Sequence, residues 1–206
     1  GDDGRDRFPN PDKILKYGKS EFLTSLKIPF YNKKGDSNGY LGYKYKHSIR
    51  YNLTYGDRFK MGIVGAQDAG EPFLSNRNRL GYDHYSYYMI LNGLGRVKTL
   101  ALGCYKVSFG MGLVINGDFN MGKIMMLSSL GRSTNNIRAN TSKAEGNYMQ
   151  GAAVTVNITN VLTASVFGSY RLLDGTMSKD GTITTIITNG YHRTQAEMNK
   201  KHNMAA

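Results

Sequence analysis

The sequence predicts an all-β chain whose antiparallel strands form part of an up-and-down transmembrane β-barrel of about eight strands. Apolar and polar residues alternate with period two in several segments, which is the pattern of strands with two different faces. The connections between these segments are alternately long and short. The longest apolar run, 124–127, is far below the ~20 residues of a transmembrane helix, so any membrane crossing must be made by strands.

The composition agrees with this fold class. The 206 residues include 25 Gly, 15 Tyr and no Trp, and only 40% are hydrophobic, which is little for a soluble core but sufficient for a barrel whose apolar face meets lipid. The net charge of +12 indicates anionic partners such as nucleic acid, lipid head groups or small anions. Residues 1–10 lack the apolar stretch of a signal peptide, so we expect a removed leader or an internal piece of a longer protein.

The clearest strand is 43–55. Its odd positions are mostly aromatic or aliphatic and its even positions are cationic or polar, over a length that suits a tilted membrane crossing of ~9–11 residues. Weaker alternation predicts further strands at 22–30, 59–66, 82–92, 97–108, 148–158, 161–172 and 182–188. We expect 43–55 to pair with 59–66, 82–92 with 97–108, and 148–158 with 161–172, because the turns between them have hairpin length.

The connections are expected at 32–41, 56–58, 67–81, 93–96, 116–147, 159–160 and 173–181. Short turns at one end and long loops at the other are typical of outer-membrane barrels, whereas a soluble sandwich has no reason to sort its loops this way. The whole of 1–206 is interpreted as one barrel segment, with 1–20 as a polar lead-in. Residues 116–147 form a long loop, within which 121–130 forms a short helix or folds into the lumen. Residues 194–206 form a short helix or tail, which begins with a capping box of Thr194 and Glu197.

In a barrel, the residues opposite the apolar faces point into the lumen. Six of these are basic: Lys44, Lys46, Arg50, Lys60, Lys106 and Arg171. A ring of such charge would favour anions; alternatively, these side chains pair with Asp or Glu of strands that are not part of this sequence. Aromatic residues on the lipid side are predicted to form the interfacial girdle: Tyr43, Tyr45, Tyr51, Tyr55, Phe59, Tyr85 and Tyr105.

Five stretches carry a resemblance to a known family: 67–73, 81–86, 94–103, 107–113, and 190–194 with Glu197. They resemble outer-membrane β-barrel proteins of Bacteroidota that carry an amino-terminal helix-hairpin-helix segment of the competence-protein type. The resemblance covers roughly 41–201. It implies a barrel located in the outer membrane of a Gram-negative cell. The helix-hairpin-helix segment and a terminal aromatic strand are missing from this sequence, so the resemblance implies an internal fragment and carries no DNA-binding role.

Two groups of residues contain side chains that could take part in catalysis or metal binding. Asp68 and Glu71 have the spacing of paired carboxylates, but the intervening Ala-Gly and the following Pro favour a tight turn. Asp83 and His84, with His47 or His192, could bind a metal or relay a proton. Their spacing in the sequence does not predict that they lie close together, so we expect them to have loop or interface roles. The sequence therefore predicts no enzyme, no catalytic residue, no metal and no cofactor.

The favoured function is a pore or a part of a transport complex, with outer-membrane lipid, anionic solutes and other outer-membrane or periplasmic proteins as partners. The first alternative is a soluble basic β domain that binds nucleic acid, although the Tyr and Lys/Arg residues of 43–55 fall on opposite faces, which is unsuited to stacking combined with phosphate contact. The second is a structural scaffold that anchors surface partners through its long loops.

Overall fold

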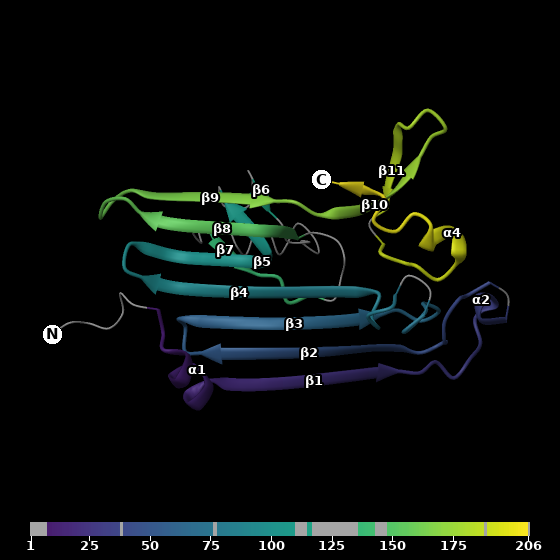
Figure 1. Ribbon diagram of the computed structural model, residues 1–206, viewed down its shortest axis with the longest axis horizontal. Coiled ribbons are helices and arrows are strands. Elements are labelled where there is room, and N and C mark those ends of the chain that lie inside the picture. Colours follow the sequence, from purple (N-terminus) through teal and green to yellow (C-terminus); the bar gives the residue numbers. More distant parts are fainter. Residues whose placement is uncertain are drawn as a thin grey trace, which may run out of the picture.

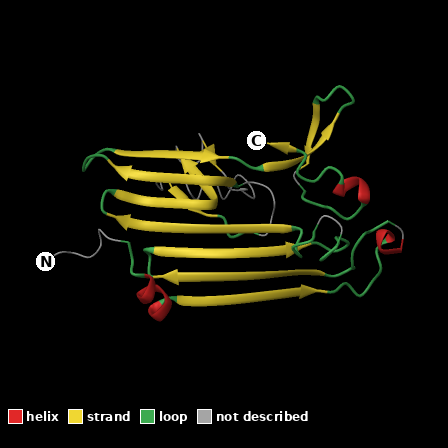
Figure 2. Cartoon of the chain, viewed as in Figure 1, coloured by secondary structure: helices red, strands yellow, loops and turns green. Residues whose placement is uncertain are grey.

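The computed structural model describes residues 8–37, 39–75, 78–109, 115–116, 136–142, 148–187 and 189–205. They form an antiparallel all-β structure with three short helices, arranged as a broad sheet and a small second sheet at one of its ends (Figures 1 and 2). No described helix is long and apolar enough to cross a membrane. The predicted helix or lumenal segment at 121–130 lies outside the described residues.

The broad sheet is a meander in which each of seven long strands pairs with the next. Its order is β1 (Lys19–Lys27), β2 (Lys46–Tyr55), β3 (Phe59–Gln67), β4 (His84–Leu94), β5 (Val97–Phe109), β8 (Met149–Asn157) and β9 (Thr163–Ser169). Two short strands, β6 (Ile115–Asn116) and β7 (Asn136–Ala139), pair with the far half of β5. The three predicted hairpins are all confirmed, because β2 pairs with β3, β4 with β5, and β8 with β9.

Several predicted boundaries are wrong. The first strand begins at Lys19 instead of Phe22. The predicted polar lead-in also contains a helix, α1 (Pro11–Tyr17), which begins after the N-cap Asn10. The Asn92-Gly93 turn signal lies inside β4, and the chain reverses at 95–96 instead. The predicted strand 161–172 is broken at 170–171, and the predicted 173–181 loop is largely β10. The predicted long loop 116–147 contains β7.

The connections are sorted by length, as expected. Residues 56–58, 95–96 and 158–162 turn at one end of the sheet. The described residues of 28–45 and 68–83, the end of β5 and the start of β8 lie at the other (Figure 1). Gly56 has φ 53° and Gly95 φ 57°, a region that L side chains rarely occupy, so these turns depend on glycine. We call the two ends the short-turn end and the long-loop end.

The register defines two faces of the sheet. Directly paired residues share a face, so Phe22, Tyr51, Ile63 and Tyr87 form one cross-strand row, and we call their side the apolar face. The opposite side, which includes Lys46, Arg50 and Lys60, is the polar face. At the short-turn end the apolar face is covered by α1, whose buried Ile14 packs on a cluster containing Leu53, Phe59 and Leu91. Leu53 is therefore buried on the apolar face.

The polar face has its own core beyond the basic rows. Tyr88, Ile90 and Ala101 pack with Tyr105, Val107, Ile137 and Ala153, so β7 covers this side of β4 and β5. The Arg50 guanidinium donates to the carbonyl of Thr141 at 2.8 Å, which places the residues after β7 across the polar face as far as β2. A segment of the predicted long loop thus lies against this face.

The carboxyl-terminal part of the chain forms a separate unit, which we call the C-terminal unit (172–205). It contains β10 (Leu172–Met177), β11 (Ile183–Ile187), α4 (Gln195–Met198) and β12 (Met204–Ala205), with sheet order β11-β10-β12. The predicted capping box of Thr194 and Glu197 is present at α4. The predicted eighth strand exists, but it belongs to this small sheet and does not extend the large one.

The large sheet is open within the described residues. Among them β1 pairs only with β2 and β9 only with β8, and the pairing of 22–30 with 182–188 that would close a ring is absent. The structure therefore shows an antiparallel all-β fold with two free edges, β1 and β9.

Candidate functional site

Three of the predicted lumenal cations lie near β2. Lys46 is paired with Asp68, which follows β3. Lys44, which precedes β2, donates to the amide oxygen of Asn32 at 3.1 Å. Arg50 reaches Thr141 as described above. Lys46 and Arg50 share the polar face, because they are even-numbered positions of one strand.

The other three cations are more scattered. Lys60 lies 3.8 Å from the carboxylate of Asp57 in the neighbouring turn. Lys106 does not lie on the polar face as predicted: it is an even position of β5, like Leu100 and Leu102, and so lies on the apolar face. It is half-buried and lies opposite Arg138 across the β5–β7 pairing. Arg171, between the two sheets, donates to the carbonyl of Tyr148 at 2.8 Å and stacks 4.5 Å from that ring. The structure does not bring all six together, and the carboxylates that pair with Lys46 and Lys60 come from this chain.

The predicted girdle residues form two groups on the apolar face, except for Tyr105. Tyr43 and Tyr45 stack at 5.2 Å at the long-loop end, where Tyr85 also lies, while Tyr51, Tyr55 and Phe59 lie toward the short-turn end. Phe59 is buried beneath α1 and contacts Phe8. Tyr105 does not belong to the girdle: it is fully buried and its hydroxyl donates to the carbonyl of Gly168 at 2.6 Å.

The long-loop end carries an aromatic array that the sequence reading missed in part. From Tyr43 and Tyr45 it continues through His47 to Phe73 and Tyr82, with ring centroids 4.8 to 6.2 Å apart at each step after the first. The Tyr82 ring lies on Gly65, where an added Cβ would come within 2.7 Å of it. A glycine thus makes room for the aromatic side chain to lie against the sheet.

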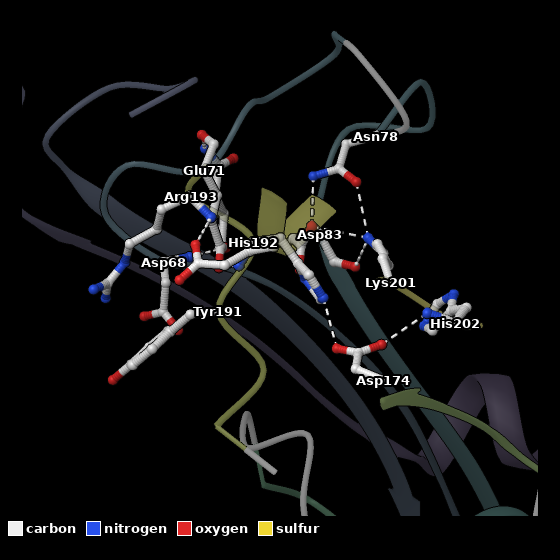
Figure 3. A network of polar contacts seen from close by, with 12 residues as sticks. Asp68, Glu71, Asn78, Asp83, Asp174, Tyr191, His192, Arg193, Lys201 and His202 are labelled. Carbon is white, nitrogen blue, oxygen red and sulfur yellow. Dashed lines mark hydrogen bonds and ion pairs between the residues drawn. The ribbon is translucent and has the colours of Figure 1, made fainter. Parts of the chain in front are cut away.

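A buried polar network joins the β3–β4 loop to the C-terminal unit (Figure 3). The ring of His192 lies between two carboxylates: its Nδ1 contacts Asp83, and its Nε2 lies 2.6 Å from Asp174. The backbone N–H of His192 donates to Glu71 at 3.0 Å. Lys201 donates to Asp83 at 2.8 Å, so two cations lie among three carboxylates. We call these five residues the clasp.

The environment of the clasp shifts its pKa values. Burial alone would lower the pKa of His192, but the hydrogen bonds to Asp174 and Asp83 and their charges raise it to about 10. Burial opposes ionisation of Asp83 and Asp174, but His192 lowers the pKa of both, together with Lys201 at Asp83 and the backbone N–H of His202 at Asp174. Burial, and then the charge of Asp83, raise the pKa of Glu71 to about 7. With His192 protonated and Glu71 neutral, the clasp has no net charge.

The clasp is better suited to holding two parts of the chain together than to chemistry. Both ring nitrogens of His192 are occupied and its side chain is 1% exposed, so it has no access to a substrate proton. Glu71, Asp83 and His192 have ligand atoms within 4.8 Å of one another and could hold a metal ion if His192 gave up its proton. In the protonated state, His192 and Lys201 already compensate the carboxylates.

The expectation that Asp83 and His192 do not come together is wrong. They are 109 residues apart and meet because the C-terminal unit folds back onto the long-loop end. Asp68 and Glu71 do form the predicted turn, since Glu71 accepts from the backbone N–H of Asp68 at 2.7 Å. His84 is buried beside the clasp, and His47 lies in the aromatic array.

Comparison with models of protein families, with curated proteins and with solved structures finds no match in any of the three.

Proposed function

We propose that this chain is the membrane-embedded part of an outer-membrane β-barrel that serves as a pore or within a transport complex. The apolar face of the seven-stranded meander would meet lipid, and the polar face would line the interior. The C-terminal unit and the clasp would lie outside the membrane at the long-loop end. The observation that carries the proposal is the exposure of large apolar side chains over the part of that face that α1 leaves uncovered.

These exposed side chains form a continuous surface. In the row Phe22, Tyr51, Ile63 and Tyr87, Phe22 is 67% exposed, Ile63 47% and Tyr87 52%. Leu26 of β1 and Val166 of β9 extend the exposed set on the same face. A soluble monomer rarely leaves a patch this broad in water, whereas lipid stabilises it without any further burial.

The dimensions of this face also fit a membrane. Aromatic residues lie at both ends of β2, with Tyr45 immediately before the strand and Tyr55 as its last residue. The 10 residues of β2 span about 33 Å at ~3.3 Å per residue. A strand tilted by ~40° would then cover about 25 Å along the membrane normal, which is the height of the apolar band of such barrels.

The polar face supports transport of anions. Lys19, Lys27, Lys46, Arg50 and Lys60 lie on it, and Glu21 is the only acidic residue among the described strand positions of that face in β1, β2 and β3. A water-filled interior with this charge would favour anionic solutes. The free edges of β1 and β9 leave room for further strands, or for other outer-membrane or periplasmic proteins, to complete the wall.

Fractionation of the cells that produce the protein tests the proposal. We expect it in the outer-membrane fraction, with gel mobility that changes on boiling because a folded membrane barrel resists detergent until heated. Recovery in the soluble fraction, with the same mobility before and after boiling, would refute it.

A further inference from the structure

The connection between β1 and β2 combines exposed apolar side chains with lysines. Phe30 is fully exposed, and Ile28, Tyr31 and Tyr43 are more than half exposed. The described residues of 27–45 also contain four lysines and one acidic residue: Lys27, Lys33, Lys34, Lys44 and Asp36. We call this segment the basic–aromatic surface.

The lysines of this surface have no carboxylate partner in the part of the chain that the structure describes. Asp36 accepts from the backbone N–H of Lys33 at 2.7 Å at the start of a short helix, α2 (Lys34–Ser37), and Lys44 donates to a neutral amide. The segment therefore presents a net positive charge to its surroundings.

The surface adjoins the apolar face at the long-loop end. Tyr43 stacks on Tyr45, and the aromatic array continues from there over the ends of β2 and β4. Leu41 donates its N–H to the carbonyl of Arg193, whose guanidinium lies 3.8 Å from the centre of the Tyr191 ring, so a fifth cation lies next to the segment. Lysines and arginine thus border an aromatic surface.

We propose that the basic–aromatic surface binds the anionic head groups of a lipid surface. Exposed aromatic and aliphatic side chains enter the head-group region, while lysines beside them contact phosphates at its outer boundary. A nucleic acid would satisfy the lysines and stack on Phe30 or Tyr31, but it would leave Ile28 in water. The location of this contact at the membrane boundary rests on the proposed function, whereas the recognition of anionic lipid does not.

Flotation of the full chain with vesicles tests the inference. Vesicles of phosphatidylcholine are compared with vesicles that also contain phosphatidylglycerol, for the natural protein and for a variant with Lys33→Gln, Lys34→Gln and Lys44→Gln. Each lysine near an anionic surface contributes about fivefold to partitioning, so the variant should lose about 100-fold on the anionic vesicles at low salt. High salt should reduce the difference.

A charge-matched variant provides the control. Lys13→Gln, Lys98→Gln and Lys179→Gln remove the same charge from exposed positions in α1, in β5 and after β10. This variant should keep partitioning within a few-fold of the natural protein. At high salt, Phe30→Ser should still lower partitioning, whereas Val161→Ser, at a similarly exposed position in a short turn, should not.

The outcomes separate the two proposals. Equal losses of vesicle partitioning in the two triple variants would overturn the inference and leave the barrel proposal intact. The same holds if the first triple variant partitions like the natural protein but binds double-stranded DNA more weakly. Selective loss in the first variant, together with recovery of the protein in the soluble fraction of cells, would support lipid recognition and refute the barrel.

Discussion

Replacement of His192 by glutamine should detach the C-terminal unit from the sheet. The substitution removes the cation that lies between Asp83 and Asp174, and both carboxylates remain buried with Lys201 as the single nearby cation of the clasp. Breaking a buried ion pair in this way costs about 3–5 kcal/mol. The rise of the His192 pKa from 6.5 to about 10 corresponds to about 5 kcal/mol, which is the same magnitude.

Hydrogen exchange measures the effect segment by segment. In His192→Gln, protection of 172–187 and 189–205 should fall by about two to three orders of magnitude, while β2, β3 and β4 should keep theirs. His202→Gln is the matched control, because His202 contacts Asp174 through its backbone N–H, which the substitution retains. Equal protection in His192→Gln and the natural protein would refute the view that the clasp holds the unit.

The same cluster predicts a pH dependence. Because the pKa of His192 is raised in the folded protein, its contribution to the stability of the C-terminal unit is complete below pH 6.5 and is lost as the pH rises toward 10. The raised pKa of Glu71 weakens the clasp in the same direction between 4.5 and about 7. The lowered pKa values of Asp83 and Asp174 instead cause loss in acid, below 3.8. Protection of the C-terminal unit should therefore fall from pH 6.5 to 10, and His192→Gln should abolish most of that fall.

Two further pairs of substitutions test the sheet, each made of a test and its control. Ile63→Arg, on the apolar face, should destabilise the protein refolded in lipid vesicles by about 2–4 kcal/mol, and Thr54→Arg, on the polar face, by far less; equal costs in urea titrations would contradict a lipid-facing surface. Gly65→Val should displace the Tyr82 ring and lower the free energy of unfolding by about 1–3 kcal/mol. Gly168→Val should be tolerated, because a Cβ at Gly168 meets nothing within 4 Å. Equal unfolding midpoints for the two variants would show that the Tyr82–Gly65 contact does not contribute to stability.

The sequence predicted the meander well because its signals are local. Alternation over 43–55 and the Gly56-Asp57 turn depend on adjacent residues, and β2 and β3 pair as that pattern requires. Boundaries were less accurate where a local signal competed with packing. The buried Ile14 places α1 on the sheet, although the segment around it is polar.

The clasp could not be predicted, because its residues are brought together by the path of the chain. No spacing relates Glu71 and Asp83 to His192, which joins them when β10 and the segment before α4 fold back on the long-loop end. Tyr105 shows the same limit: its alternation with Lys106 indicated an exposed position, but β7 and β8 pair with β5 at this residue and its side chain is buried in the cluster.

Tryptophan fluorescence in lipid vesicles tests the membrane orientation of the sheet most directly. The chain contains no Trp, so a single introduced Trp reports on its own position. Phe22 and Leu23 are adjacent, both exposed, and on opposite faces of β1. We predict that brominated phosphatidylcholine quenches Phe22→Trp and that aqueous iodide quenches Leu23→Trp. Equal quenching of the two variants by either agent would contradict a sheet with one face in lipid.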